Sequence, residues 1–194
     1  RIEVLRAPTA AGAFIRSRGG DVRTGDIVLS AGERLGPYAL AAAAAAGVDR
    51  VEVRRRPRVA VVSTGSELVP PGAAPGRGQT PDSNATLLAS LVADADAEVV
   101  LVAHASDDAG EIDAVLTRAA EADVVVFTGG VSAGAYEPVR QALSDRIAFV
   151  KVAMQPGKPQ AFGVLDDGRL VFGLPGNPVS VAVSFEVFVR PALL

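Results

Sequence analysis

The sequence predicts an α/β fold of three layers, with a mostly parallel sheet between two layers of helices. Residues 57–194 alternate apolar runs of strand length with helix-compatible stretches, which is the order expected of β-α-β units. The run at residues 124–127 is continuously apolar and contains three valines, as expected for a strand buried on both faces. Hydrophobic residues form 49% of the 194-residue chain, which is enough to build a sizeable core.

Residues 1–56 have a different pattern, with short elements of both kinds. Strands are predicted at residues 2–5 and 51–54. A helix is predicted over residues 37–46, because proline suits a first turn, alanine favours helix and Gly47 can end it. We interpret this segment as the end of a small mixed α/β region.

The arginine-rich segment at residues 54–58, interrupted by a proline, predicts a solvated linker. The β-α-β pattern begins directly after it. We therefore place the boundary between the mixed region and the second domain at residues 56 and 57.

The strands of the second domain follow from its short apolar runs. A hairpin signal, Asp166-Asp167-Gly168, separates the last two runs. The predicted strands are residues 59–62, 98–102, 124–127, 147–153, 160–164 and 169–173.

The helices follow from apolar residues at helical spacing. Ser83 or Asn84 can cap the first of them, and Asp107 or Asp108 can cap the second. The last helix is apolar nearly all round, so we expect it to be buried. The predicted helices are residues 84–95 with the face Leu87, Leu88, Leu91 and Val92, a helix with the stripe Ile112, Val115, Leu116 and Ala119, residues 138–144 and residues 179–190.

Composition narrows the class of function. A net charge of −3 offers no basic surface for nucleic acid. The chain has no cysteine and one histidine, His104, which excludes thiolate and histidine-cluster metal sites. His104 has no evident partner and is expected to be structural. No apolar run reaches 18 residues, so we expect no membrane span and a cytoplasmic protein.

Loops rich in glycine, proline and acidic residues follow the predicted strands. Ligands of open α/β sheets bind beyond the carboxyl ends of parallel strands, and right-handed crossovers place those ends at one edge. We therefore expect Glu67, Asp107, Glu137 and Lys158 to converge. The loops are residues 63–68, 104–108, 128–137, 154–159 and 173–178.

These residue types suit phosphate chemistry. A strand that ends in glycines, as at Gly129-Gly130, lets backbone N–H groups approach an anion closely. Carboxylates facing such a cradle suggest Mg²⁺, which would neutralise charge during phosphoanhydride cleavage. Lys158, between prolines, could neutralise an oxyanion. Taken singly, each acid is more typical of a helix cap or a solvated side chain, and Lys158 is equally typical of an ordinary surface lysine.

Six motifs together carry a family resemblance. They are Ser63-Thr64-Gly65-Ser66-Glu67-Leu68, Asp82-Ser83-Asn84, Ser106-Asp107-Asp108, Thr128-Gly129-Gly130-Val131-Ser132, Pro156-Gly157-Lys158-Pro159 and Gly173-Leu174-Pro175-Gly176-Asn177-Pro178-Val179-Ser180. With these motifs the chain resembles the molybdopterin molybdenumtransferases, the MoeA and gephyrin E-domain family, over essentially its whole length. The resemblance implies that residues 1–56 end the family's N-terminal region and that residues 57–194 form its molybdopterin-binding domain. The family's early N-terminal part and its C-terminal β-domain are expected to lie outside this sequence.

The resemblance implies an enzyme that inserts molybdenum from molybdate into adenylylated molybdopterin, with Mg²⁺ and release of AMP. It also implies a homodimer, with a molybdopterin adenylyltransferase as a possible partner. Asp21, Glu67, Asp107 and Glu137 are the implied catalytic residues, and Asp107 and Glu137 the metal ligands. The implied substrate-binding residues are Thr64, Gly65, Ser83, Asn84, Gly129, Gly130, Ser132, Pro156, Gly157, Lys158, Pro175, Gly176, Asn177 and Ser180.

Three positions depart from the family pattern. Glu137 and Ser66 stand where the family usually has aspartate and another acidic residue, and Gln155 where it commonly has lysine. Two other hypotheses stay open, and the three departures favour the second of them. A molybdopterin adenylyltransferase would share the sheet but would not carry residues 1–56. The second hypothesis is a module that binds the pterin or a partner protein without catalysis. Binding without turnover in an otherwise complete protein would favour it.

Overall fold

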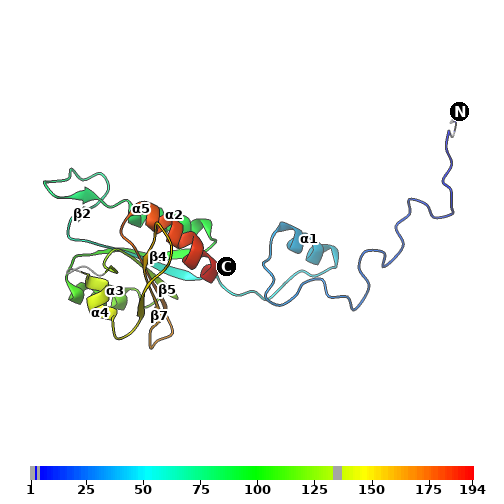
Figure 1. Cartoon of the computed structure of the whole chain (residues 1–194). Coiled ribbons are helices and arrows are strands. Elements are labelled where there is room, and N and C mark those ends of the chain that lie inside the picture. Colours follow the sequence, from blue (N-terminus) through cyan, green and yellow to red (C-terminus); the bar gives the residue numbers. More distant parts are fainter. Residues whose placement is uncertain (1–2, 4, 133–136) are drawn as a thin grey trace. The chain divides into compact units, whose positions relative to one another are not determined.

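The computed structural model describes residues 3, 5–132 and 137–194. The chain divides into two compact units, Arg1–Arg54 and Arg55–Leu194 (Figure 1). Every helix in the described part of the chain is too short or insufficiently apolar to span a bilayer.

The first unit contains one described helix, α1 (Pro37–Ala45), which confirms the prediction at that segment. Gly47 ends it at φ +83°, where the Val48 N–H donates to the Ala43 carbonyl. The strand predicted at residues 51–54 is wrong: this segment has no regular structure, because no strand lies beside it within the described part of the unit. The strand predicted at 2–5 includes residues 2 and 4, which lie outside the described residues.

The second unit is built on a six-stranded sheet in the order β4-β1-β5-β8-β7-β6. Neighbours among the first four strands pair in parallel, whereas β7 is antiparallel to both β8 and β6. The mostly parallel sheet is thus confirmed. Its strands are β1 (Arg58–Thr64), β4 (Glu98–Ala105), β5 (Val124–Thr128), β6 (Ala148–Lys151), β7 (Pro159–Val164) and β8 (Leu170–Leu174). A separate parallel pair joins β2 (Leu68–Val69) to β3 (Thr80–Pro81).

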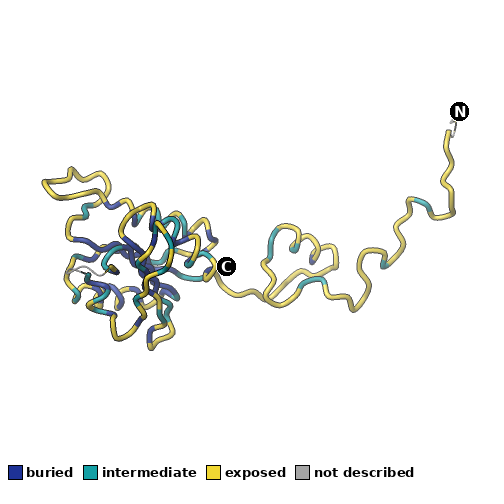
Figure 2. The backbone as a smooth tube through the Cα atoms, in the orientation of Figure 1, coloured by how far each residue is buried: buried dark blue, intermediate teal, exposed yellow. Residues whose placement is uncertain are grey.

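Helices cover both faces of the sheet, as Figure 1 shows. On β5, Val125 and Phe127 pack into the core beneath α3 and α4, and Val124 and Val126 into the core beneath α2 and α5. This burial on both faces explains the uninterrupted apolar run of the strand. Figure 2 shows the buried residues concentrated in the sheet. The helices are α2 (Asn84–Asp94), α3 (Ala109–Arg118), α4 (Pro138–Leu143) and α5 (Pro178–Ser184).

The last helical segment differs from its prediction. It continues from α5 through a π-helix, η1 (Phe185–Val189), into α6 (Arg190–Leu193). Val181 and Phe185 are fully buried, but Val179 and Val187 are 63% and 51% exposed. Full burial was therefore wrong, because the sheet covers one side of this segment and leaves the other apolar side open.

The helix caps also differ in part. Asp108, one of the two candidates, caps α3 by accepting the Gly110 N–H at 2.8 Å. At α2, Ser83 occupies the N-cap position, but neither its side chain nor that of Asn84 caps the helix. Asp82 instead accepts the Ala85 N–H at 3.0 Å, so the carboxylate one residue earlier satisfies the helix end.

The arginine-rich linker is tied to the second unit rather than simply solvated. Arg55 Nη1 donates to Asp123 Oδ2 and Arg55 Nη2 donates to Asp123 Oδ1, each at 2.6 Å. The backbone N–H of Arg58 donates to Asp123 Oδ2 at 2.8 Å. Hydrogen bonding from Arg55 lowers the pKa of Asp123 below its ordinary value. The linker therefore enters β1 from a fixed point.

Candidate functional site

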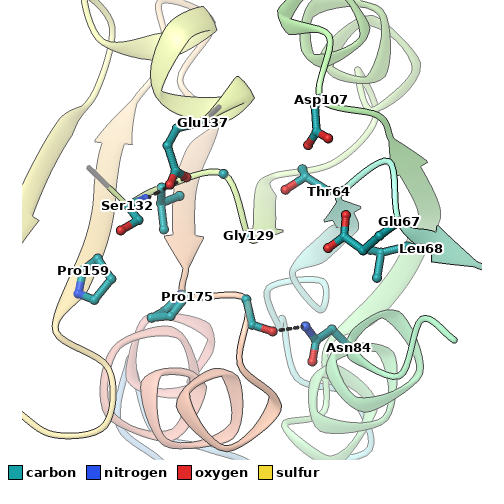
Figure 3. Close-up of a pocket in the computed structure, with 14 residues that line it drawn as sticks. Thr64, Glu67, Leu68, Asn84, Asp107, Gly129, Ser132, Glu137, Pro159 and Pro175 are labelled. Carbon is teal, nitrogen blue, oxygen red and sulfur yellow. Dashed lines mark hydrogen bonds between the residues drawn. The ribbon is translucent and has the colours of Figure 1, made fainter. Parts of the chain in front are cut away.

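A cavity of about 560 Å³ lies at the edge of the sheet where β1, β4, β5 and β8 end (Figure 3). It is lined by Thr64, Gly65, Glu67, Leu68, Asn84, Asp107, Gly129, Gly130, Val131, Ser132, Glu137, Pro159, Pro175 and Gly176. Four parallel strands thus supply the loops around it, which is the expected place for a ligand in an open α/β sheet.

We call five of the lining residues, together with the buried Thr128 to which two of them are hydrogen-bonded, the floor of the cavity: Thr64, Asn84, Gly129, Gly130 and Gly176. Gly129 has a φ of +85°, and a Cβ there would lie 2.9 Å from the Thr64 carbonyl oxygen. A side chain would thus meet backbone that cannot move aside. Glycine at 129 is required both by its conformation and by the close approach of the β1 end.

Hydrogen bonds hold the floor together. The Thr64 hydroxyl donates to the Thr128 carbonyl at 3.0 Å. The Asn84 side-chain N–H₂ donates to the Thr128 hydroxyl at 3.0 Å and to the Gly176 carbonyl at 2.7 Å. Figure 3 shows Asn84 bridging to the loop after β8. Asn84 therefore connects the start of α2 to the ends of β5 and β8.

The Asn84 carboxamide has a fixed orientation. Reversing it would place its oxygen against the Gly176 carbonyl, where two acceptors would face each other. In the observed orientation Oδ1 is buried and lacks a hydrogen-bond partner among the described residues. Both N–H groups of the Asn84 side chain are thus used in hydrogen bonds within the fold.

We call Glu67, Asp107 and Glu137 the rim of the cavity. Glu67 and Asp107 are exposed, and Glu137 is half-buried. Asp107 Oδ2 accepts the Ser66 N–H at 3.2 Å, and Glu137 Oε2 accepts the Ser132 N–H at 2.9 Å. Among the described residues of the lining, these three are the ionisable ones, and all are acidic.

The turn that carries Glu67 is held by His104. The His104 Nε2 lies 2.8 Å from the Gly65 carbonyl oxygen, which can only accept, so Nε2 carries the proton. His104 thus has a partner that its sequence position did not reveal, because the contact joins residues 39 positions apart.

The loop after β5 is held by Arg140 of α4. Its Nε donates to the Ser132 carbonyl at 2.8 Å, and its guanidinium stacks 4.5 Å from the centre of the Phe149 ring. The Arg140 N–H also donates to the Gly130 carbonyl at 3.0 Å. The described part of this loop is therefore fixed at both ends.

Several residues predicted for the site lie outside the cavity lining. Asn177 caps α5 by accepting the Val179 and Ser180 N–H groups, and Ser180 is buried within that helix. Gly157 is buried against Met154 and Ser184. Lys158 is exposed, and its loop reaches the cavity through Pro159. Ser83 and Pro156 are also outside the lining.

Asp21 belongs to the first unit, where Arg16 Nη1 donates to its Oδ2 at 2.6 Å. Its role in the site remains a prediction. Residues 133–136 of the predicted loop 128–137 lie outside the described residues.

Sequence reasoning did not assign Leu68, Val131 and Pro159 to the site. All three belong to motifs that were recognised, since Leu68 and Pro159 end theirs and Val131 lies within its own, so their places in the motifs were the available signal. Thr128, Ser66 and His104 were also not assigned, because each acts through a hydrogen bond to a distant loop.

The described residues contain no group of three or more His, Cys, Asp or Glu side chains that could hold a metal ion. The rim acids stand on separate walls of the cavity, as Figure 3 shows for Asp107 and Glu137. The described rim is therefore an acidic surface whose carboxylates come from different loops.

Comparisons with known proteins agree with this architecture. A family model described as a probable molybdopterin binding domain matches residues 60–194, and one described as the MoeA N-terminal region (domain I and II) matches residues 1–47. The chain is 46% identical to molybdopterin molybdenumtransferase 2 of Mycobacterium tuberculosis, over 97% of this chain and 49% of that protein. It is 43% identical to molybdopterin molybdenumtransferase 1 of the same organism, over 100% and 46%.

A solved structure shows the same likeness. The molybdopterin biosynthesis MoeA protein of Pyrococcus horikoshii superposes with a TM-score of 0.74 at 36% identity, over 90% of this chain and 44% of that chain. The chain spans about half the length of the curated relatives that it matches. Because the two family models occur in this order over most of its length, the chain belongs to the molybdopterin molybdenumtransferase (MoeA) family.

Proposed function

We propose that this chain carries the substrate cavity of a molybdopterin molybdenumtransferase, which inserts molybdenum from molybdate into adenylylated molybdopterin with release of AMP. The observation that carries the proposal is the cavity itself, with a glycine floor and an acidic rim at the strand ends. The names of relatives 43–46% identical to the chain support the choice of reaction. The activity is proposed for the whole protein, because the chain spans about half the length of those relatives.

The floor is suited to bind the phosphate groups of the substrate. Gly129, Gly130 and Gly176 let the backbone approach a ligand without side chains in between. In this proposal the floor binds the phosphate of the pterin. The rim faces the phosphoanhydride bond that joins this phosphate to AMP.

The acidic rim fits a divalent cation that arrives with the substrate. Carboxylate oxygens are the donors that Mg²⁺ prefers, and Mg²⁺ is usually held by one or two carboxylates together with substrate phosphates. Asp107 and Glu137 would hold it here, with phosphate oxygens completing the set. Bound there, Mg²⁺ would neutralise charge that develops as the phosphoanhydride bond breaks.

The remaining assignments complete this proposal. Lys158 and Ser180 would contact molybdate or phosphate, and Asp21 would be a further catalytic residue of the whole protein. The whole protein would act as a cytoplasmic homodimer and would receive its substrate from a molybdopterin adenylyltransferase. An adenylyltransferase activity of this chain itself is not favoured, because residues 1–47 match the MoeA N-terminal region.

The test uses the full-length protein with purified adenylylated molybdopterin and Mg²⁺. AMP release is followed with and without molybdate, and binding of the pterin is measured separately by its fluorescence. The proposal predicts AMP release that depends on molybdate. Binding without release would contradict it and would indicate a pterin-binding or scaffold protein; ATP-dependent formation of the adenylylated pterin would indicate an adenylyltransferase.

A further inference from the structure

Three acids follow β4, and the structure gives each a different task. Glu111 accepts the Ser106 N–H at 2.6 Å, and Asp108 accepts the Gly110 N–H as the cap of α3. Both carboxylates are therefore occupied at the start of the helix. Asp107 alone among the three lines the cavity.

A reciprocal pair of hydrogen bonds joins Asp107 to Ser66. The Ser66 N–H donates to Asp107 Oδ2 at 3.2 Å, and the Asp107 N–H donates to the Ser66 hydroxyl oxygen at 3.1 Å. The first bond orients the carboxylate and the second fixes the backbone that carries it. Asp107 Oδ1 receives no hydrogen bond from the described residues, so it is available to a ligand.

The residue before Ser66, Gly65, joins the same turn to β4 through two further hydrogen bonds. The Gly65 N–H donates to the Ala105 carbonyl at 3.1 Å, and His104 Nε2 donates to the Gly65 carbonyl at 2.8 Å. With the two Ser66–Asp107 bonds, four hydrogen bonds thus connect the turn after β1 to the end of β4. The position of Ser66 relative to Asp107 is therefore fixed by the hydrogen bonds of this turn.

We propose that Ser66 is a positioning residue that holds the Asp107 carboxylate at the rim in its working orientation. This inference rests on the proposed function, in which Asp107 faces the bond that is broken. A misplacement of about 1 Å in a reacting group can reduce a rate about 100-fold. Because the Ser66 side chain supplies one of two bonds, its removal should cost about tenfold in kcat.

The experiment compares Ser66→Ala, Ser66→Thr and the control Ser90→Ala in the full-length protein. Ser90 is exposed on α2, and its hydroxyl donates to Thr86 of its own helix. Ser66→Ala should lower kcat for AMP release about tenfold with KM for adenylylated molybdopterin unchanged. Ser66→Thr keeps the hydroxyl and should retain activity, and all three should keep the wild-type melting temperature.

A second measurement does not depend on activity. Hydrogen exchange of the Asp107 backbone N–H, followed by NMR, should accelerate in Ser66→Ala and stay unchanged in Ser66→Thr and Ser90→Ala. Wild-type kcat in Ser66→Ala would overturn the positioning role. If the wild-type protein releases no AMP, the proposed function fails, and the positioning role is then judged by hydrogen exchange alone. Unchanged exchange of the Asp107 N–H in Ser66→Ala overturns the inference. Faster exchange supports the hydrogen bond between Ser66 and Asp107.

Discussion

The floor and the rim of the cavity are adjacent but are built in opposite ways. Thr64, Asn84 and Thr128 of the floor are buried and hydrogen-bonded to one another or to backbone. The rim acids Glu67 and Asp107 are exposed and face solvent. The floor residues are thus held in place by the fold itself, whereas these two rim acids lie open to solvent.

Because of this difference, substitutions in the floor and in the rim should affect stability and turnover differently. Removing a buried, hydrogen-bonded group leaves its partners unsatisfied, which costs free energy of folding. Removing an exposed carboxylate costs little stability, because water solvates the charge in either state. Substitutions in the floor should therefore reduce both stability and ligand binding, and substitutions in the rim should reduce turnover with little loss of stability.

The largest effect is expected at the rim. Asp107→Ala should abolish AMP release in the full-length protein while pterin binding is partly retained, because the floor stays intact. Turnover and pterin fluorescence measure the two properties separately. Asp145→Ala, at an exposed acid beyond α4, is the matched control and should behave as wild type. Unchanged turnover in Asp107→Ala would remove Asp107 from the chemistry.

Gly129→Ala tests the floor most severely. Its positive φ and the clash with the Thr64 carbonyl should together cost about 2–4 kcal/mol of unfolding free energy and strongly weaken pterin binding. Denaturant unfolding measures the first effect. Gly168→Ala is the control for conformation alone, because Gly168 has a φ of +87° but no atom within 4 Å of the added Cβ. Equal losses in the two variants would mean that the close approach at Gly129 is unimportant.

Asn84→Ala removes the bridge between α2 and the ends of β5 and β8. Two hydrogen bonds are lost, so the unfolding free energy should fall by about 2 kcal/mol and pterin affinity about tenfold. Thr86→Ala, on the exposed side of the same helix, should change neither. A variant with weaker binding but full stability would indicate that Asn84 contacts the ligand instead of holding the floor.

The smallest effect concerns the linker, which lies where β1 and β5 begin, whereas the cavity lies where they end. Hydrogen bonding from Arg55 lowers the pKa of Asp123 in the folded state, so its ionised form stabilises the fold above the ordinary pKa of 3.8. That contribution is lost as the pH falls through the lowered folded-state value. Asp123→Asn should reduce the melting temperature at pH 7 by about 2 °C, because the pair is largely exposed.

The difference between wild type and Asp123→Asn should shrink as the pH falls below the ordinary value of 3.8. Melting curves between pH 7 and pH 3 measure it, with Asp145→Asn as the control. A difference that grows toward low pH would contradict the assigned sign.

The sequence predicted the layers well, since the apolar runs of β1 and β5 are long and buried on both faces. It failed where an element depends on its neighbours. Residues 51–54 have strand-like composition but no pairing partner among the described residues of their unit. The last helical segment is apolar on a side that the sheet does not cover.

For the site, strand ends and glycines were sufficient to predict which loops meet. They could not show which side chains are already engaged within the fold. Asn177 was assigned to the substrate, yet its side chain caps α5. Ser66 was regarded as a lost charge, yet it forms two hydrogen bonds with Asp107. Such pairings join residues far apart in sequence, so no local pattern reveals them.

The most direct test of the central claim is a crystal structure of the full-length protein with adenylylated molybdopterin. The account predicts the pterin phosphate over Gly129 and Gly130, with Asp107 facing the bond to AMP. A ligand bound elsewhere, with the cavity at the strand ends filled by solvent alone, would contradict it.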